Sequence, residues 1–265
     1  MGIDYVIDLP CDPKRALGVE QIVNLVKARS RAEAVLELVR KDGDARGPDQ
    51  ISITTVLQTT DGVTEQQVTV QELLDQARAL DDHRAACASC PANAGRDGFG
   101  CYRSIAYPIT EDAEAWMLGR LPDDLESSAG VFLVRALADF GWDGEHAAEM
   151  RGQGDTFFES DDALAVRWGD EDDEDGLQVD ADQIFHMLFH VGNIGETHAM
   201  MLCLFFGVLP HDVDLEVLRD DDARRKALAA ATLPPQGSPG IEAFAELLRA
   251  LALAASLDVD VLIDG

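Results

Sequence analysis

The pattern of apolar and polar positions predicts both strands and helices in the N-terminal part of the chain. Strand-like runs of β-branched or alternating residues occur at 3–9, 51–59, 63–70 and 102–107. The second and third runs flank Asp61-Gly62, a dipeptide that favours the tight turn of a β-hairpin. Apolar side chains recur at helical spacing in 19–40, as one helix or as two broken near Ser30, and in 72–80. We therefore expect a β-hairpin between helices.

The remainder of the chain is predominantly helical by the same criterion. Helical spacing of apolar residues predicts helices at 111–120, 125–140, 181–191, 196–208, 213–231 and 241–256. Two strand-like runs, 156–160 and 163–168, predict a second hairpin, and a last strand is expected over 257–263. The helices at 181–191 and 196–208 are apolar on nearly every face, which is typical of helices at the centre of a domain.

These elements place the protein in the α+β class. Its 265 residues fit one large domain or two small ones. We expect residues 1–110 to form a mixed part with a β-hairpin and a metal-binding cysteine loop. Residues 111–265 should form a mainly helical part, and the two parts should share one core as one compact unit.

The composition is strongly acidic and limits the choice of partners. Asp and Glu number 50 against 21 Lys and Arg, which gives a formal net charge of −29. Such a surface repels phosphate groups and therefore argues against nucleic acids and anionic membranes as partners. It suits a basic protein partner, although adaptation to a salty host would produce the same composition.

The sequence also bears on the compartment. No apolar run reaches the ~18–20 residues that a membrane-spanning helix needs. The first residues, Met1-Gly2-Ile3-Asp4-Tyr5, lack the basic and then apolar pattern of a signal peptide. We therefore expect a cytoplasmic protein, and nothing in the sequence sets its oligomeric state.

The cysteines carry the strongest chemical signal in the chain. Cys87 and Cys90 form a C-x₂-C pair, and Cys101 follows across a loop rich in glycine. Two residues between the sulfurs let both thiolates face one ion, and the glycines let the loop fold back. Zinc in a structural site takes four such ligands in a tetrahedron. We expect Cys11, in a proline-rich turn after the first strand, to be the fourth ligand, with His83 as the alternative.

Other chemistry fits the same cysteines. Pro91 directly follows Cys90, as proline often follows the ligands of iron–sulfur clusters, although the spacing matches no standard cluster. A redox disulfide between Cys87 and Cys90 is a further alternative, which the lack of a βαβ setting weakens. Cys203 lies between two leucines and is interpreted as a core residue. Zinc in a role linked to folding remains the preferred prediction.

A second group of candidate residues lies on the two apolar helices. His186 and His190 share one helical face, and Glu196 and His198 begin the next helix. They could act as metal ligands or acid–base groups, or simply satisfy one another as buried polar side chains. The motif of zinc proteases requires glutamate where this chain has Met187, so hydrolysis by that mechanism is not supported.

Two weaker patterns receive structural interpretations. The acidic segment 171–182 partly matches a calcium-binding loop, but its first and last ligand positions differ, which favours a hydrated loop. Arg151-Gly152-Gln153-Gly154 precedes a strand-like segment, whereas a phosphate-binding loop leads into a helix.

The leading functional hypothesis is a zinc-stabilised binding or adaptor protein that acts through a protein partner. It rests on the cysteine set and on the lack of a complete catalytic constellation in the sequence. The alternatives are a metal-dependent enzyme that uses the histidines and Glu196, and an iron–sulfur or redox sensor that uses the cysteines.

Overall fold

The computed structural model describes residues 2–59, 62–93, 98–169, 176–189, 192–233 and 237–264. The α+β class is confirmed, with small antiparallel sheets and a mainly helical C-terminal part. The chain forms two compact units. Met1–Leu9 and Cys101–Gly265 make up the main unit, and Pro10–Gly100 makes up the inserted unit. The chain thus crosses between units at two points, whereas a single boundary near residue 110 was expected.

The inserted unit contains mostly helices and one hairpin. Its elements are α1 (Asp12–Leu17), α2 (Val19–Lys41), β2 (Ser52–Thr59), β3 (Gly62–Thr69), α3 (Val70–Ala77) and α4 (Arg84–Ala88). Two short 3₁₀ helices, Pro48–Gln50 and Arg78–His83, join them.

The main unit contains a small sheet and most of the helices. Its strands are β1 (Gly2–Ile7), β4 (Tyr102–Ala106), β5 (Ala165–Arg167), β6 (Gln178–Asp180) and β7 (Val261–Asp264). Its helices are α5 (Glu111–Leu118), α6 (Ser128–Phe140), α7 (Glu145–Arg151), α8 (Ala181–Phe189), α9 (Glu196–Phe205), α10 (Leu215–Arg219), α11 (Asp221–Ala230) and α12 (Pro239–Ser256). Within the described ranges, no helix is both long enough and apolar enough to cross a membrane.

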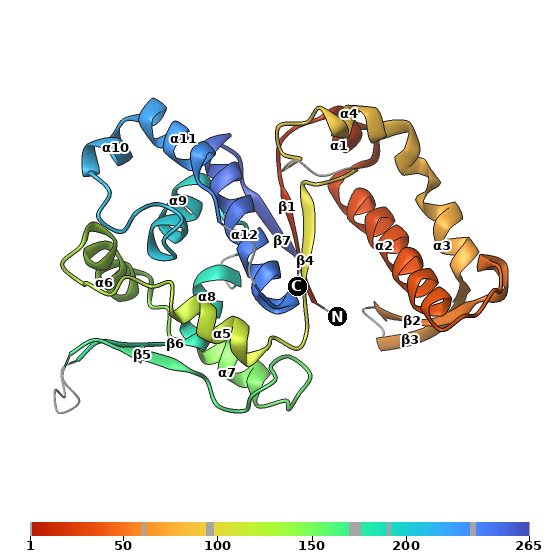
Figure 1. Cartoon of the computed structure of the whole chain (residues 1–265), viewed down its shortest axis with the longest axis horizontal. Helices are drawn as coiled ribbons and strands as arrows, with labels where there is room; N and C mark the ends of the chain where they lie inside the picture. Colours follow the sequence, from red (N-terminus) through yellow and green to blue (C-terminus); the bar gives the residue numbers. More distant parts are fainter. Residues whose placement is uncertain are drawn as a thin grey trace. The chain divides into compact units, whose positions relative to one another are not determined.

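A three-stranded antiparallel sheet with the order β4-β1-β7 organises the main unit. Tyr5 lies opposite Arg103 of β4 and Ile263 of β7, which fixes the register of both pairs. Helix α12 packs along this sheet, and α9 packs against α12 (Figure 1). Phe185 of α8 meets Phe244 of α12 edge to face, with ring centroids 5.7 Å apart. Aromatic pairs of this kind add to the stability of a core beyond their buried area.

The inserted unit has its own apolar packing, in two clusters. One cluster joins α2, β3 and α3 and includes Ala32, Val70 and Leu73. Thr69 and Glu72 form a reciprocal capping box at the start of α3, which satisfies backbone N–H groups left open at a helix N-terminus. The other cluster contains Ile22, Leu25, Ala77, Leu80, Cys87 and Phe99. The second cluster therefore anchors the cysteine segment to α2 and α3.

Most predicted elements are confirmed, and four expectations need correction. The expected hairpin between 156–160 and 163–168 is wrong, because β5 pairs with β6 instead. The expected helix over 213–231 is two helices, because the Asp220 carboxylate accepts a hydrogen bond from Ala223 N at 2.8 Å and starts α11. Helix α7 was not expected, and α4 occupies part of the predicted irregular cysteine loop.

Candidate functional site

Three of the predicted cysteine ligands belong to the inserted unit. Cys11 precedes α1, Cys87 is buried in α4, and Cys90 follows α4. Helices α1 and α4 contact each other, and the Cys90 backbone N–H donates to the Cys87 carbonyl at 3.1 Å. Cys101 begins the segment of the main unit that leads into β4. All five cysteines are described, and they form no disulfide with one another.

The buried side chain of Asn93 holds the cysteine segment together. Its amide nitrogen donates to the Cys87 carbonyl at 3.0 Å, and its Oδ1 accepts from Gly100 N at 2.9 Å. The Asn93 backbone N–H also donates to the Cys90 carbonyl at 3.0 Å. One side chain thus fixes the two ends of this segment, so that the residue before Cys101 is tied to Cys87.

His83, the alternative ligand, could reach the site only if a helical turn connected it with Cys87. His83 ends a 3₁₀ helix and is the N-cap residue of α4, so a helical turn does connect it with Cys87. Over the ranges that the structure describes, however, no three His, Cys, Asp or Glu side chains form a group that could hold a metal ion. The zinc and iron–sulfur hypotheses stay predictions.

His186 and Glu196 have separate partners. His186 Nδ1 lies 3.1 Å from Asp143 Oδ1 and accepts from Gly144 N at 3.2 Å. Glu196 forms an ion pair with Arg224 of α11 at 2.7 Å. His190 lies outside the described residues. The Glu196 carboxylate is thus already neutralised by a cation.

His198 occupies an apolar setting on α9. Its ring stacks on Trp142, with centroids 5.8 Å apart and planes inclined by 14°. Its Nε2 atom is buried without a hydrogen-bond partner in the described part of the chain. Burial lowers the pKa of His198, and a hydrogen bond to the Met187 backbone opposes that shift. A neutral imidazole is the form that such surroundings favour.

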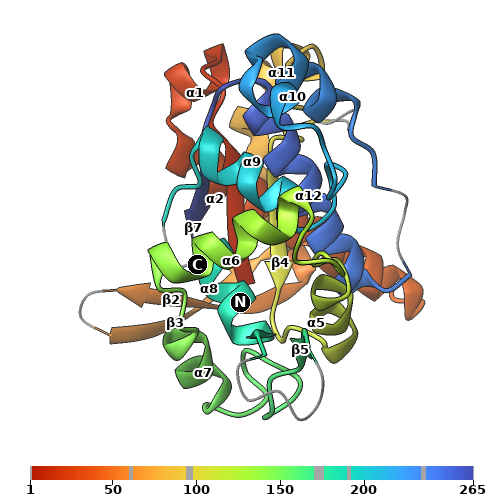
Figure 2. The ribbon, with the colours of Figure 1, turned by 90° about the vertical axis from the view of Figure 1, so that its left-hand side faces the viewer.

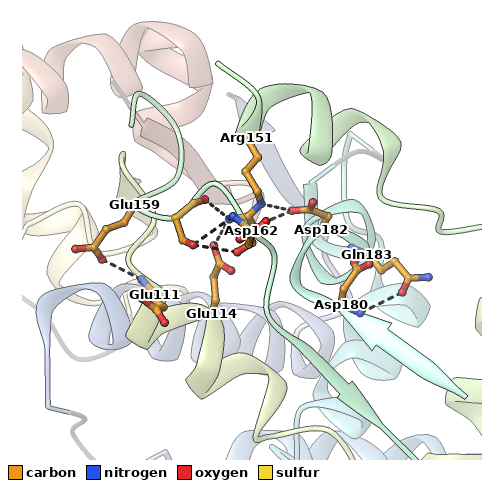
Figure 3. A network of polar contacts seen from close by, with 9 residues as sticks. Glu111, Glu114, Arg151, Glu159, Asp162, Asp180, Asp182 and Gln183 are labelled. Carbon is orange, nitrogen blue, oxygen red and sulfur yellow. Dashed lines mark hydrogen bonds and ion pairs between the residues drawn. The ribbon is translucent and has the colours of Figure 1, made fainter. Parts of the chain in front are cut away.

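In the described part of the main unit, buried polar side chains gather around Arg151 (Figure 3). Arg151, at the end of α7, is only 3% exposed. Its Nε and Nη2 both donate to Oδ1 of Asp182 on α8, at 3.0 and 2.8 Å. Its Nη1 donates to the Ser160 carbonyl at 2.8 Å, and its guanidinium lies 4.0 Å from the centroid of Phe158. Each of the three guanidinium nitrogens thus has a partner inside the protein.

Glu114 of α5 completes the cluster with a second carboxylate. It is 1% exposed, and its Oε1 lies 2.9 Å from Arg151 Nη1 as an ion pair. This contact with Arg151 and the Leu164 backbone are the interactions that favour a charge on Glu114. Burial is the largest cause that raises the pKa of Glu114, and Arg151 opposes it. Helices α5, α7 and α8 therefore meet at one cation and two carboxylates.

Sequence reasoning did not identify this cluster. Arg151 was considered only within the Arg-Gly-Gln-Gly segment and Asp182 only at the end of the acidic segment 171–182, and Glu114 was not singled out. The signal was weak, because each charge falls on a different element and only the tertiary packing brings the three together.

Helix α6 carries four of the exposed large apolar side chains in the described part of the main unit. Figure 2 shows α6 on the outside of this unit, and the helix contacts α9 beneath it. Ala129, Leu133 and Ala136 are buried on its inner face. The exposed residues are Val131 (57%), Phe132 (42%), Val134 (41%) and Phe140 (58%), and together they are called the α6 surface below.

Comparisons with known proteins add no family to this description. The chain matches no protein-family model, no curated protein and no solved structure. Any assignment of function therefore rests on the geometry and the charge of the chain itself.

Proposed function

We propose that the protein is a binding protein whose α6 surface recognises a basic, apolar-faced segment of another protein. The observation that supports this proposal is the apolar character of α6 on both its inner and its outer face. A helix that is apolar all round is normally buried. Clustered apolar side chains that stay exposed on a folded protein commonly mark a binding surface.

The charge around α6 favours a basic partner. Between residues 123 and 145, six acidic residues accompany α6: Asp123, Asp124, Glu126, Asp139, Asp143 and Glu145. Arg135 is the single basic residue in that stretch, and it is paired with Asp139 at 2.6 Å. A second copy of this chain would bring another net charge of −29 and would be repelled. A segment with lysine or arginine beside apolar residues would complement both features.

Binding of a defined probe tests the α6 surface. The probe is a synthetic helical peptide of leucine and lysine at amphipathic spacing, and its affinity is measured by fluorescence anisotropy. Replacing Phe132 and Val134 with serine should weaken binding by about tenfold or more, because a few apolar anchors dominate such interfaces. Leu38→Ser is the matched control, since Leu38 is 62% exposed on α2 of the inserted unit. Added salt should also weaken binding.

Three results would contradict this proposal. Equal binding by the α6 variant and the wild type would mean that the peptide does not bind to this surface. Equal affinity for a leucine–glutamate peptide of the same spacing would remove the requirement for a basic partner. A dimer of the wild type that the α6 substitutions dissociate would assign the surface to a second copy of the chain.

We also propose that the protein is cytoplasmic and that a bound zinc ion has a structural role in it. The supporting observation is that Cys11, Cys87 and Cys90 belong to contacting segments of one unit. Asn93 also links the Cys87 carbonyl to the backbone of Gly100, the residue before Cys101. The proposed tetrahedral set is Cys87, Cys90, Cys101 and Cys11, with His83 as the alternative to Cys11. Metal bound in this way would stabilise the inserted unit, because such binding is linked to folding.

Elemental analysis and thermal unfolding test the metal proposal. We expect one zinc per chain, and Cys87→Ser and Cys90→Ser should lose the metal and lower the melting temperature. The control is Cys203→Ser or Cys203→Ala, a buried core position that should leave the metal content unchanged. A chain without metal would exclude this role, and a brown iron-containing protein would instead indicate a cluster.

A further inference from the structure

The buried cluster around Arg151 contains more negative than positive charge. If both carboxylates are ionised, Glu114 and Asp182 place two negative charges around one guanidinium in a region that is almost fully buried. An uncompensated charge in the protein interior is strongly unfavourable, and a buried acid normally avoids it by taking up a proton.

The hydrogen bonds distinguish the two carboxylates. Asp182 accepts two hydrogen bonds from Arg151 and lies in the first turn of α8, where the helix dipole favours a negative charge. Glu114 shares Arg151 Nη1 with the Ser160 carbonyl, lying 2.9 Å from it, and its other support is the Leu164 backbone; these contacts oppose burial but do not outweigh it. The surroundings therefore stabilise charge on Asp182 and leave the charge on Glu114 poorly compensated.

The other element that packs on α5 supplies no further cation. Helix α12 contacts α5, and its Gly240 approaches Ala113. The charged residues of α12 have partners elsewhere: Glu242 pairs with Arg249, and Glu246 pairs with Arg103 of β4. Arg151 from α7 and Asp182 from α8 are thus the charged groups that face Glu114.

We propose that Glu114 holds a proton in the folded main unit at neutral pH and that its ionisation loosens the junction of α5, α7 and α8. The junction thereby acts as a pH-sensitive device. Deprotonation of Glu114 places a second negative charge beside Asp182. Separation of the helices then lets water reach the Glu114 carboxylate.

The direction of the pH effect follows from the sign of the pKa shift. The pKa of Glu114 is raised above its ordinary value of 4.5, with burial as the largest cause. An acid of this kind stabilises the fold fully below its unfolded pKa, and the contribution is lost as pH rises through the folded pKa. Stability linked to Glu114 should therefore fall as the pH increases.

Denaturant unfolding of the full chain tests this proposal between about pH 5 and pH 8. The wild type is compared with Glu114→Gln, which keeps the shape of the side chain and cannot ionise. The unfolding equilibrium constant of the wild type, relative to that of the variant, should rise by about tenfold or more with pH. Glu111→Gln, on the exposed side of α5, is the matched control and should follow the wild type. A constant ratio between wild type and Glu114→Gln would overturn the proposal.

Two further measurements keep the proposal falsifiable if Glu114→Gln folds poorly. Infrared spectra of the wild type at neutral pH should contain the carbonyl band of a protonated carboxylic acid, and its absence would contradict the assignment. Asp182→Asn should reduce the pH dependence, because it leaves Arg151 with a single carboxylate to neutralise. An unchanged pH dependence in Asp182→Asn would mean that competition for Arg151 is not its cause.

Discussion

Replacing Arg151 with methionine should reduce the free energy of unfolding of the main unit by about 3–5 kcal/mol. Methionine fills much of the same volume but leaves Asp182 buried without its two hydrogen bonds and Glu114 without its contact to the guanidinium. Folded domains are stable by only about 5–15 kcal/mol, so this substitution removes a large share of the total. The loss is large because the charge left on Asp182 is buried and has no other cation to pair with in the cluster.

Denaturant unfolding with a matched control checks this expectation. Arg219→Met removes an arginine of the same unit that pairs with Glu216 on the surface, where the side chains are 73% and 77% exposed. Exposed ion pairs contribute little, so this control should change stability by less than about 1 kcal/mol. Similar losses in the two variants would mean that the buried cluster is not held together by Arg151.

Replacing Gly100 with alanine should destabilise the inserted unit by about 3 kcal/mol. A Cβ atom at this position would lie 2.0 Å from Asn93 Oδ1 and 2.7 Å from the Asn93 backbone oxygen. The Asn93 side chain is buried and bonded to both ends of the cysteine segment, so it cannot move aside without losing those hydrogen bonds. Hydrogen exchange of amides within 10–100 and the melting temperature measure the loss.

Two companion variants make the Gly100 experiment specific. Gly47→Ala is the control in the same unit, because the new Cβ would meet only the exposed carboxylate of Asp49, which can move. The double substitution Asn93→Ala with Gly100→Ala should be less harmful than the sum of the two single changes, since they share one contact. Full additivity would mean that Gly100 acts independently of Asn93.

Patterns local in sequence predicted most of the fold. The β-rich runs on both sides of Asp61-Gly62 predicted a hairpin, and β2 and β3 are paired in the structure. The spacing of apolar residues predicted α2 and α12 close to their observed bounds. The pairing of β5 with β6 was missed, because an acidic segment separates these short strands and the strand-like runs 156–160 and 163–168 lie closer together in sequence. Helix α7 was missed because glycines on both sides obscured its short apolar repeat.

The candidate sites were predictable to different degrees. The C-x₂-C spacing identified Cys87 and Cys90 directly, whereas Asn93, which holds their segment together, carried no recognisable motif. The buried state of Glu114 depends on Arg151 and Asp182, which come from other helices, so no local pattern could indicate it. The sequence could not predict the exposure of Phe132 either, because apolar residues on both faces of a helix normally indicate that the helix is buried.

The two chain crossings have a consequence for how the protein reaches its native state. Ile7 N donates to the Cys101 carbonyl at 3.0 Å, so β1 and β4 are neighbours although all of Pro10–Gly100 lies between them in sequence. The entropy of closing such a loop grows only with the logarithm of its length, about 0.6 kcal/mol for each doubling, so a long excursion is thermodynamically tolerable. Pairing of strands so distant in sequence is slow, however, because it raises the contact order. The central sheet should therefore form late, after the helices within each unit have gained structure.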